Sequence, residues 1–310
     1  MNGSVGTGTH SGTRLLKFSV VPIRMNSGEI FPWIWFADFK KIVVLPICFF
    51  LLSRNPISLH LNFSFMYDLA KLFETLQSLK TQKVFVRMKD LFDKDISQAK
   101  NLAVVRCDVE RDLPHHLDFA QKAHEIGIPC TFYFHSRREC YDPQIFQKVK
   151  EMGHEVGFHH ECIDRCRGDF ESAKTLFTKE VARFKKDGFF PETVCAHGES
   201  GLFKSGYRFN YELFTRYPDL LSSCGVSAEV YNDIIPKWKP VYVSDVFSSY
   251  RHFWSKIEAG KTKPELMHLL IHPHRWHSSL LKSELEVGID LFQAFKNKTL
   301  KYRSYNAIEV

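Results

Sequence analysis

The sequence has no run of basic residues, no internal repeat and no glycine-rich phosphate loop. Its net charge of +7 comes from 42 Lys and Arg against 35 Asp and Glu, and the basic residues are spread among acidic ones. It also has no helix-turn-helix, zinc-finger or RNA-binding signature, so we expect no nucleic-acid partner. Gly3, Gly6 and Gly8 lie in a polar tail rather than before a helix, which excludes a nucleotide fingerprint there.

The 8 cysteines lack the dense pairing of a small secreted scaffold. Those at 107, 130, 162 and 195 fall in or beside apolar strand-like runs, where a free cysteine behaves as a small hydrophobic residue. This usage favours a reducing compartment, and we expect a cytoplasmic protein. Cys162 and Cys166 have the spacing of half a zinc site, but no second Cys or His pair accompanies them, so we interpret the spacing as chance.

Residues 1–61 differ from the rest of the chain and form an N-terminal extension that we expect to be partly disordered. Residues 1–13 are mostly Gly, Ser and Thr, with little to bury. The apolar run IVVLPICFFLL at 42–52 is shorter than the roughly 20 residues of a bilayer-spanning helix, and it lies too far from Met1 for an ordinary signal peptide. Two interpretations of this run stay open: a membrane anchor, or an extension that is poorly structured or packs on the protein.

Residues 62–310 have the pattern of one globular domain, and the hydrophobic content of the whole chain, 44%, is enough for a full core. A helical period of apolar residues at 65–80 precedes strand candidates at 102–107, 130–134, 155–159, 193–196, 241–244 and 266–271. Helix candidates lie between them at 115–126, 142–152 and 169–187, bounded by Asp142 as an N-cap and by Gly127, Gly153 and Gly188 as stops. This alternation predicts an α/β fold with a parallel sheet, open or closed, and suits a (β/α) barrel.

Ionisable residues follow most of these strand candidates. They are Asp108 and Glu110 after the first, His159 and Glu161 after the third, His197 after the fourth, Asp245 after the fifth, and His272 and Arg275 after the last. Taken singly, each is explained by a solvated loop or a core histidine. Because the carboxyl ends of parallel strands meet at one rim, their joint occurrence there predicts metal-assisted hydrolysis, with carboxylates and neutral imidazoles holding a divalent ion.

Four segments then resemble one family. Residues 102–112, GIPCTFYF at 127–134, GHEVGFHHE at 153–161 and LLIHPHRW at 269–276 look like the polysaccharide deacetylase, or NodB-homology, superfamily. The likeness is greatest to its polysaccharide-deacetylase-like branch, in which Arg-His-Asp-Val-Asp replaces Thr-Phe-Asp-Asp-Gly. It covers the chain from about residue 62 to the end. The resemblance implies a distorted (β/α) barrel of about seven strands that removes acetyl groups from a carbohydrate with one divalent metal ion, which we take to be zinc.

The resemblance also implies roles for single residues. Asp108 would be the general base and His272 the general acid, while Glu110 and His159 would hold the metal ion. We expect the substrate to contact Arg106, His197, Arg275 and Trp276. For Trp276, two interpretations stay open: stacking on a sugar face, or packing in the core.

The chain departs from the family pattern at the second metal histidine, where it has Ile163. Glu161 or His197 would have to replace that ligand, and we take Glu161 as the third metal ligand. Glu110 also replaces the Asp of the branch. Two hypotheses follow: a carbohydrate deacetylase, or a catalytically altered carbohydrate-binding domain on the same barrel. Hydrolysis of a non-sugar amide is not separated from these by the sequence.

Overall fold

The computed structural model describes residues 19–24, 30–35, 67–93, 96, 99–198, 209–246, 252–290 and 292–293. The chain divides into two compact units, Met1–Leu61 and Asn62–Val310. In the first unit, β1 (Ser19–Arg24) pairs antiparallel with β2 (Ile30–Trp35). The polar tail and the apolar run at 42–52 lie outside the described residues, and so do the predictions made for them. Among the helices of the described ranges, none has the length and apolarity that crossing a membrane requires.

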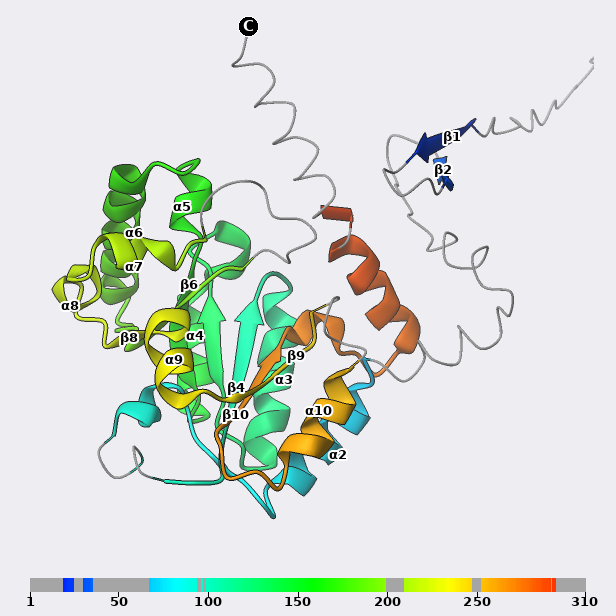
Figure 1. Cartoon of the computed structure of the whole chain (residues 1–310), viewed down its shortest axis with the longest axis horizontal. Coiled ribbons are helices and arrows are strands. Elements are labelled where there is room, and N and C mark those ends of the chain that lie inside the picture. Colours follow the sequence, from blue (N-terminus) through cyan, green and yellow to red (C-terminus); the bar gives the residue numbers. More distant parts are fainter. Residues whose placement is uncertain are drawn as a thin grey trace, which may run out of the picture. The chain divides into compact units, whose positions relative to one another are not determined.

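The second unit is built on a parallel sheet (Figure 1). The strands are β3 (Val84–Phe85), β4 (Leu102–Val109), β5 (Thr131–Phe134), β6 (Glu155–His160), β7 (Thr193–Ala196), β8 (Ala228–Glu229), β9 (Val241–Ser244) and β10 (Met267–Ile271). Their order is β8-β7-β6-β5-β4-β10-β9, and β3 pairs with the start of β4. Among the described residues β8 and β9 do not pair, so the sheet is a curled half-barrel that is open on one side. The predicted distorted barrel of about seven strands is confirmed in this open form.

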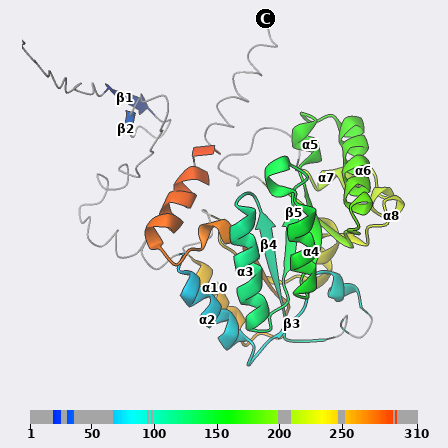
Figure 2. The ribbon, with the colours of Figure 1, turned by 180° about the vertical axis from the view of Figure 1, so that it is seen from behind.

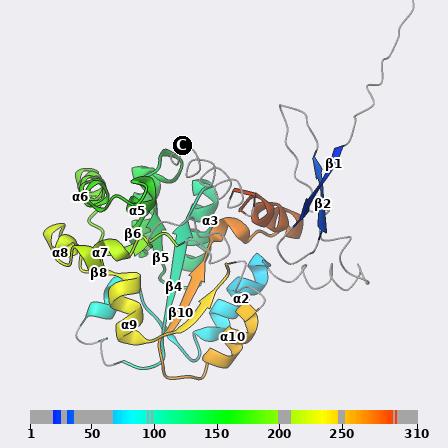
Figure 3. The same cartoon turned by 45° about the horizontal axis from the view of Figure 1, so that its top comes forward.

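Most helices pack on the outer face of the sheet. They are α2 (Leu69–Leu79), α3 (Leu113–Glu125), α4 (Pro143–Glu151), α5 (Cys162–Arg165), α6 (Phe170–Lys186), α7 (Glu212–Arg216), α8 (Leu220–Ser223) and α10 (Phe253–Gly260). The short helix α9 (Ile235–Trp238) packs on the inner face. Figure 2 shows α3 and α4 over β4 and β5, where Phe119 of α3 packs edge-on against Phe132 of β5. Figure 3 shows α7 and α8 beside α6.

The helix boundaries follow from capping residues that the sequence displays. Asp142 accepts a hydrogen bond from Gln144 N at 2.9 Å, and Pro143 occupies the first turn of α4, where its missing N–H does no harm. Gly153 and Gly188 follow α4 and α6 with φ of +85° and +87°, in the left-handed region that favours glycine. The helices predicted at 115–126, 142–152 and 169–187 therefore agree with α3, α4 and α6 to within two residues, whereas α2 begins at Leu69, four residues after the start of the predicted helical period at 65–80.

Alternation along each strand decides which side chains face the inside of the half-barrel. On β4, Val105, Cys107 and Val109 pack into the core under the helices, whereas Val104 belongs to a smaller core cluster on the other face. A strand turns successive side chains to opposite faces, so Arg106 and Asp108 share the inner face with Val104. The residues expected to do chemistry are thus turned toward the interior rather than toward solvent.

The segment GHEVG at 153–157 connects β6 to its neighbours in the sheet. The imidazole of His154 accepts from Cys130 N at 3.0 Å and pairs with Ala120 O at 2.9 Å. A Cβ added at Gly157 would lie 2.5 Å from the Tyr133 ring, which crosses β6 to reach Thr193 on β7. Only glycine leaves room for that ring.

Candidate metal centre

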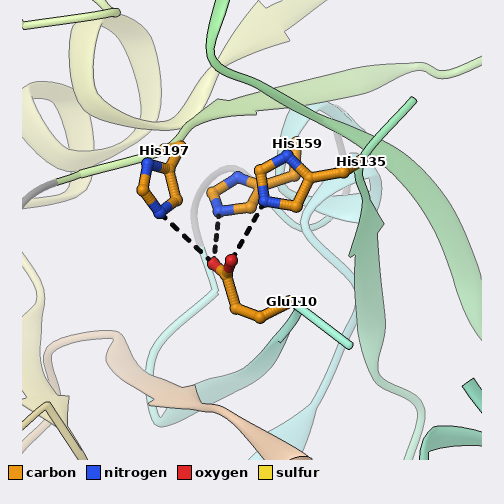
Figure 4. A group of neighbouring side chains, drawn as sticks. All are labelled: Glu110, His135, His159 and His197. Carbon is orange, nitrogen blue, oxygen red and sulfur yellow. Dashed lines mark hydrogen bonds and ion pairs between the residues drawn. The ribbon is translucent and has the colours of Figure 1, made fainter. Parts of the chain in front are cut away.

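Four side chains converge where neighbouring strands end (Figure 4). They are Glu110 after β4, His135 after β5, His159 on β6 and His197 after β7, and we call them the metal centre. One donor atom from each lies within 4.8 Å of the donors of the other three. Since β4, β5, β6 and β7 are consecutive neighbours in a parallel sheet, each strand delivers one ligand to the same rim.

Strand register sets the height of each ligand. Asp108 pairs with Tyr133, and Tyr133 pairs with Gly157. Glu110, His135 and His159 each follow one of these positions by two residues, so all three lie on one level of the inner face. On β7 the partner of His159 is Cys195, so His197 stands one level higher.

The Glu110 carboxylate lies at the middle of the metal centre. Its Oε2 lies 3.2 Å from His135 Nε2, and its Oε1 lies 3.5 Å from both His159 Nε2 and His197 Nε2. Burial alone raises the pKa of Glu110, but His197 and His135 outweigh it and hold that pKa well below its ordinary value. Burial lowers the pKa of His135 to about 3, so its ring is neutral near pH 7, the state in which imidazole binds a metal.

His159 turns one ring nitrogen toward the carboxylates of the metal centre. Its Nδ1 donates to Cys195 O at 3.0 Å, so in the neutral ring Nε2 carries the lone pair, and Nε2 lies 3.4 Å from Asp108 Oδ2 and 3.5 Å from Glu110 Oε1. This buried Nε2 has no hydrogen-bond partner among the described residues. Burial lowers the pKa of His159, but Asp108 and Glu110 outweigh it and the net shift is upward. A cation among these atoms would pair the lone pair with both carboxylates, so the residues fit a divalent metal.

Asp108 is held by Arg106, its neighbour on the inner face of β4. The guanidinium donates from Nε to Oδ1 at 2.7 Å and from Nη2 to Oδ2 at 2.6 Å, and both side chains are buried. Burial alone would raise the pKa of Asp108, but Arg106 and then His159 hold it well below its ordinary value. Asp108 is therefore ionised at neutral pH and fixed in direction beside His159.

A second pair of residues, Asp245 and His272, follows β9 and β10. His272 Nδ1 lies 2.6 Å from Asp245 Oδ1, and its backbone N donates to Oδ2 at 2.7 Å. Trp276 Nε1 donates to the same Oδ2 at 2.8 Å. Burial raises the pKa of Asp245, but His272 outweighs it, and the pKa lies below its ordinary value. The anionic Asp245 fixes the proton of His272 on Nδ1 and leaves Nε2 free to exchange one.

The structure groups the predicted ligands differently from the sequence. Glu110 and His159 lie together as expected, and His197, which we assigned to the substrate, lies with them. Glu161 does not: it lies outside the metal centre, with its Oε1 3.4 Å from Arg137 Nε. Sequence reasoning missed His135, although it stands one residue after a predicted strand, the same position that drew attention to His197.

The residues expected to touch substrate are mostly engaged with protein. Arg106 is 1% exposed and paired with Asp108. Arg275 Nε donates to Asp290 at 2.7 Å. Trp276 is fully buried, so its surroundings favour the core-packing interpretation over stacking on a sugar. Of this set His197 is the most open, with 27% of its side chain exposed.

Comparison with known proteins adds a likeness of structure. No protein-family model matches the chain, and no curated protein does. Among solved structures, the peptidoglycan deacetylase PdaC of Bacillus subtilis is similar at 14% identity and a TM-score of 0.37, over 68% of this chain and 98% of that one. A CE4 esterase of Streptococcus mutans is similar at 15% identity and a TM-score of 0.38, over 75% and 89%.

A mutant of the CE4 family pseudoenzyme BA3943 with restored enzymatic activity is similar at 14% identity and a TM-score of 0.30, over 62% of each chain. The chain thus has low-identity structural similarity to CE4 polysaccharide deacetylases. At these values the likeness assigns no activity. The class defined by the topology and the side chains is an α/β half-barrel with a candidate metal centre at the carboxyl ends of its strands.

Proposed function

We propose that the protein is a metal-dependent hydrolase that removes acetyl groups from a carbohydrate. One observation carries this proposal: a carboxylate and three imidazoles from four neighbouring strands converge, with the inward lone pair of buried His159 left unpartnered. When bound there, a divalent ion supplies Lewis acidity and lowers the pKa of a coordinated water. Zinc is the first candidate, because imidazole nitrogen and carboxylate oxygen are among its usual ligands.

Within this proposal Glu110, His159, His135 and His197 hold the ion. His135 and His197 take the place of the histidine that the chain replaces with Ile163, which is fully buried and faces the core. A ligand that follows a neighbouring strand can replace one from α5, because only the position of its donor atom matters to the ion. The altered sequence pattern is thus compatible with a complete ligand set.

Asp108 and His272 would divide the proton transfers between them. Asp108, oriented by Arg106 and next to His159, would accept a proton from the attacking water. His272, with Nδ1 bonded to Asp245, would return a proton from Nε2 to the leaving sugar nitrogen or oxygen. A base with a pKa far below 7 accepts protons weakly, so the site would depend on the metal ion to make the water acidic.

The carbohydrate part of the proposal rests on the motifs at 102–112, 127–134, 153–161 and 269–276. The second candidate, a carbohydrate-binding domain without catalysis, is favoured by Ile163 at the position of the second metal histidine. The two candidates differ in whether the metal centre holds an ion that supports turnover.

The test is metal analysis of the purified full chain together with acetate release from N-acetylated and O-acetylated oligosaccharides. We expect about one divalent ion per chain, and acetate release that stops on chelation and returns when the ion is restored. A bound ion with no release from any acetylated sugar would favour the binding domain. Absence of a stoichiometric ion under metal-replete conditions would contradict the metal centre itself.

A further inference from the structure

A cluster of charged side chains lies behind Asp245 and His272. It joins helix 280–290, orange-red in Figure 1, to the turn η6 (Pro273–Arg275) that follows β10. Asp290 of this helix is 2.7 Å from Arg275 Nε, 2.5 Å from Arg111 Nη1 and 3.1 Å from His274 Nε2. One carboxylate thus ties the helix both to the residue after Glu110 and to the segment that carries His272.

Arg275 is shared unequally between two carboxylates. Its bond to Asp290 Oδ2, at 2.7 Å, has the length of a strong charge-assisted hydrogen bond, whereas its Nη1 lies 3.4 Å from Asp245 Oδ1, at the limit for one. The same Nη1 is 3.2 Å from His272 Nδ1. Nη1 also donates to the backbone oxygen of Asp245 at 3.3 Å. Asp290 therefore takes the shortest hydrogen bond of the guanidinium, and Asp245 Oδ1 stays available to His272 at 2.6 Å.

We infer that Asp290 is a positioning residue for His272 and acts through Arg275 and Asp245. When Asp290 is replaced by an uncharged residue, Asp245 is the carboxylate that Arg275 still contacts. The guanidinium then moves onto Asp245 Oδ1 and competes with His272 Nδ1 for it. The imidazole loses the partner that fixes its tautomer and direction. The effect on turnover rests on the proposed function, but the effect on the Asp245–His272 bond does not.

Asp290→Asn tests the inference, and Glu286→Gln is its matched control. Glu286 lies one turn earlier on the same helix and accepts from Arg111 Nε at 2.9 Å. Both substitutions remove one negative charge from the helix and weaken one contact of Arg111. Of the two carboxylates, Asp290 is the one bonded to Arg275, so only Asp290→Asn frees that guanidinium.

The first readout is the low-field proton NMR signal of His272 Nδ1–H, assigned by its loss in His272→Gln. We expect Asp290→Asn to shift or abolish this signal, and to lower kcat for acetate release by about 10-fold with little change in KM. Asp290→Glu should recover part of the signal and part of kcat. Glu286→Gln should leave the signal and kcat unchanged. Adding Arg275→Gln to Asp290→Asn removes the competitor and should restore the signal.

An unchanged signal in Asp290→Asn would overturn the inference, as would an equal change in Glu286→Gln or the absence of the signal from the unmodified protein. If Asp290→Asn does not fold, the variant that carries both Asp290→Asn and Arg275→Gln provides the test. If that variant folds but lacks the His272 Nδ1–H signal, the inference is also overturned. If the unmodified protein releases no acetate while the signal responds as expected, the proposed function fails and the positioning role of Asp290 stands.

Discussion

The two sides of the site differ in how completely their polar atoms are paired. In the metal centre, His159 Nε2, His135 Nδ1 and His197 Nδ1 have no hydrogen-bond partner among the described residues. On the other side, the Asp245 carboxylate accepts from the backbone and Nδ1 of His272 and from the indole of Trp276. An unpaired buried polar atom costs about 1–3 kcal/mol. Of these three atoms, His159 Nε2 is the one that faces Glu110 and would gain a partner from a bound ion, whereas the Asp245 carboxylate already has its partners.

This difference separates two forms of preorganisation. His272 is held by protein alone, so its geometry should be the same with and without metal. The imidazoles of the metal centre lack most of the outer hydrogen bonds that orient metal-binding histidines, and only His159 has one, to Cys195 O. Their geometry should therefore tighten when an ion binds. The predictions below test this contrast, from the largest effect to the smallest.

The largest effect is expected from His159→Ala. Loss of a hydrogen bond that orients a metal ligand weakens metal binding by up to about 100-fold. Removing the imidazole of His159 itself should weaken metal binding by more than this. Metal titration of the apoprotein measures this. His160→Leu is the matched control, because His160 faces the rings of Phe177 and Phe214 and has neither nitrogen bonded among the described residues. Retention of a stoichiometric ion by His159→Ala would remove His159 from the site.

Asp108→Asn should keep the metal ion and lose turnover. A general base typically contributes about 10²- to 10⁴-fold, so kcat should fall within that range. Stability should fall as well, because breaking a buried ion pair costs about 3–5 kcal/mol when the other charge, here Arg106, stays buried. Acetate release and urea denaturation measure the two effects. Unchanged turnover in a variant that binds metal would rule out Asp108 as the base.

Acid should destabilise the metal-free protein from about pH 6.5 downward. Burial lowers the pKa of several histidines from 6.5: His116, His135 and His268 to about 3, and His274 to about 4. Below pH 6.5 the unfolded chain binds protons that these folded rings do not, so the free energy of unfolding falls as pH falls, by about 1.4 kcal/mol per pH unit for each proton. Burial raises the pKa of Glu229 to about 7, which offsets roughly one proton of this difference.

Urea midpoints between pH 7 and pH 5 measure this dependence, and His268→Gln should reduce its slope by the share of one proton. A midpoint that does not change over this range would contradict the buried neutral histidines. Adding metal should steepen the loss in acid, because protons compete with the ion for the imidazoles of the metal centre. A metal-dependent change in this pH dependence would therefore come from the metal centre and not from the Asp245–His272 pair.

The smallest effect is expected from the contact of Gly157 on β6 with the Tyr133 ring of β5. Gly157→Ala would place a methyl group 2.5 Å from the Tyr133 ring and should lower the free energy of unfolding by about 1–3 kcal/mol, as overpacking does. Gly288→Ala is the control: nothing lies within 4 Å of the added Cβ, and in helix 280–290 alanine should stabilise by up to about 1 kcal/mol. Thermal unfolding measures both. If Gly157→Ala were as stable as the unmodified protein, the Tyr133 ring would have to move aside without cost.

Much of the scaffold could be predicted from local patterns. The strands at 193–196 and 241–244 have the predicted boundaries, and the helices stop at the glycines that end them. These features depend on residues close in sequence, whose alternation and capping act over a few positions. Strands of two residues, such as β3 and β8, were missed because so short a segment carries no periodic signal.

The set of metal ligands was harder to predict from the sequence than the scaffold, and His135 and Glu161 show why. Both stand one residue past a strand, so local sequence treats them alike. The sequence by itself determined that ionisable side chains follow strands and face one rim, because alternation and cap chemistry are local properties. Only the tertiary structure decided which of them meet, since convergence to within 4.8 Å depends on strand order, register and curl, which arise from contacts between distant segments.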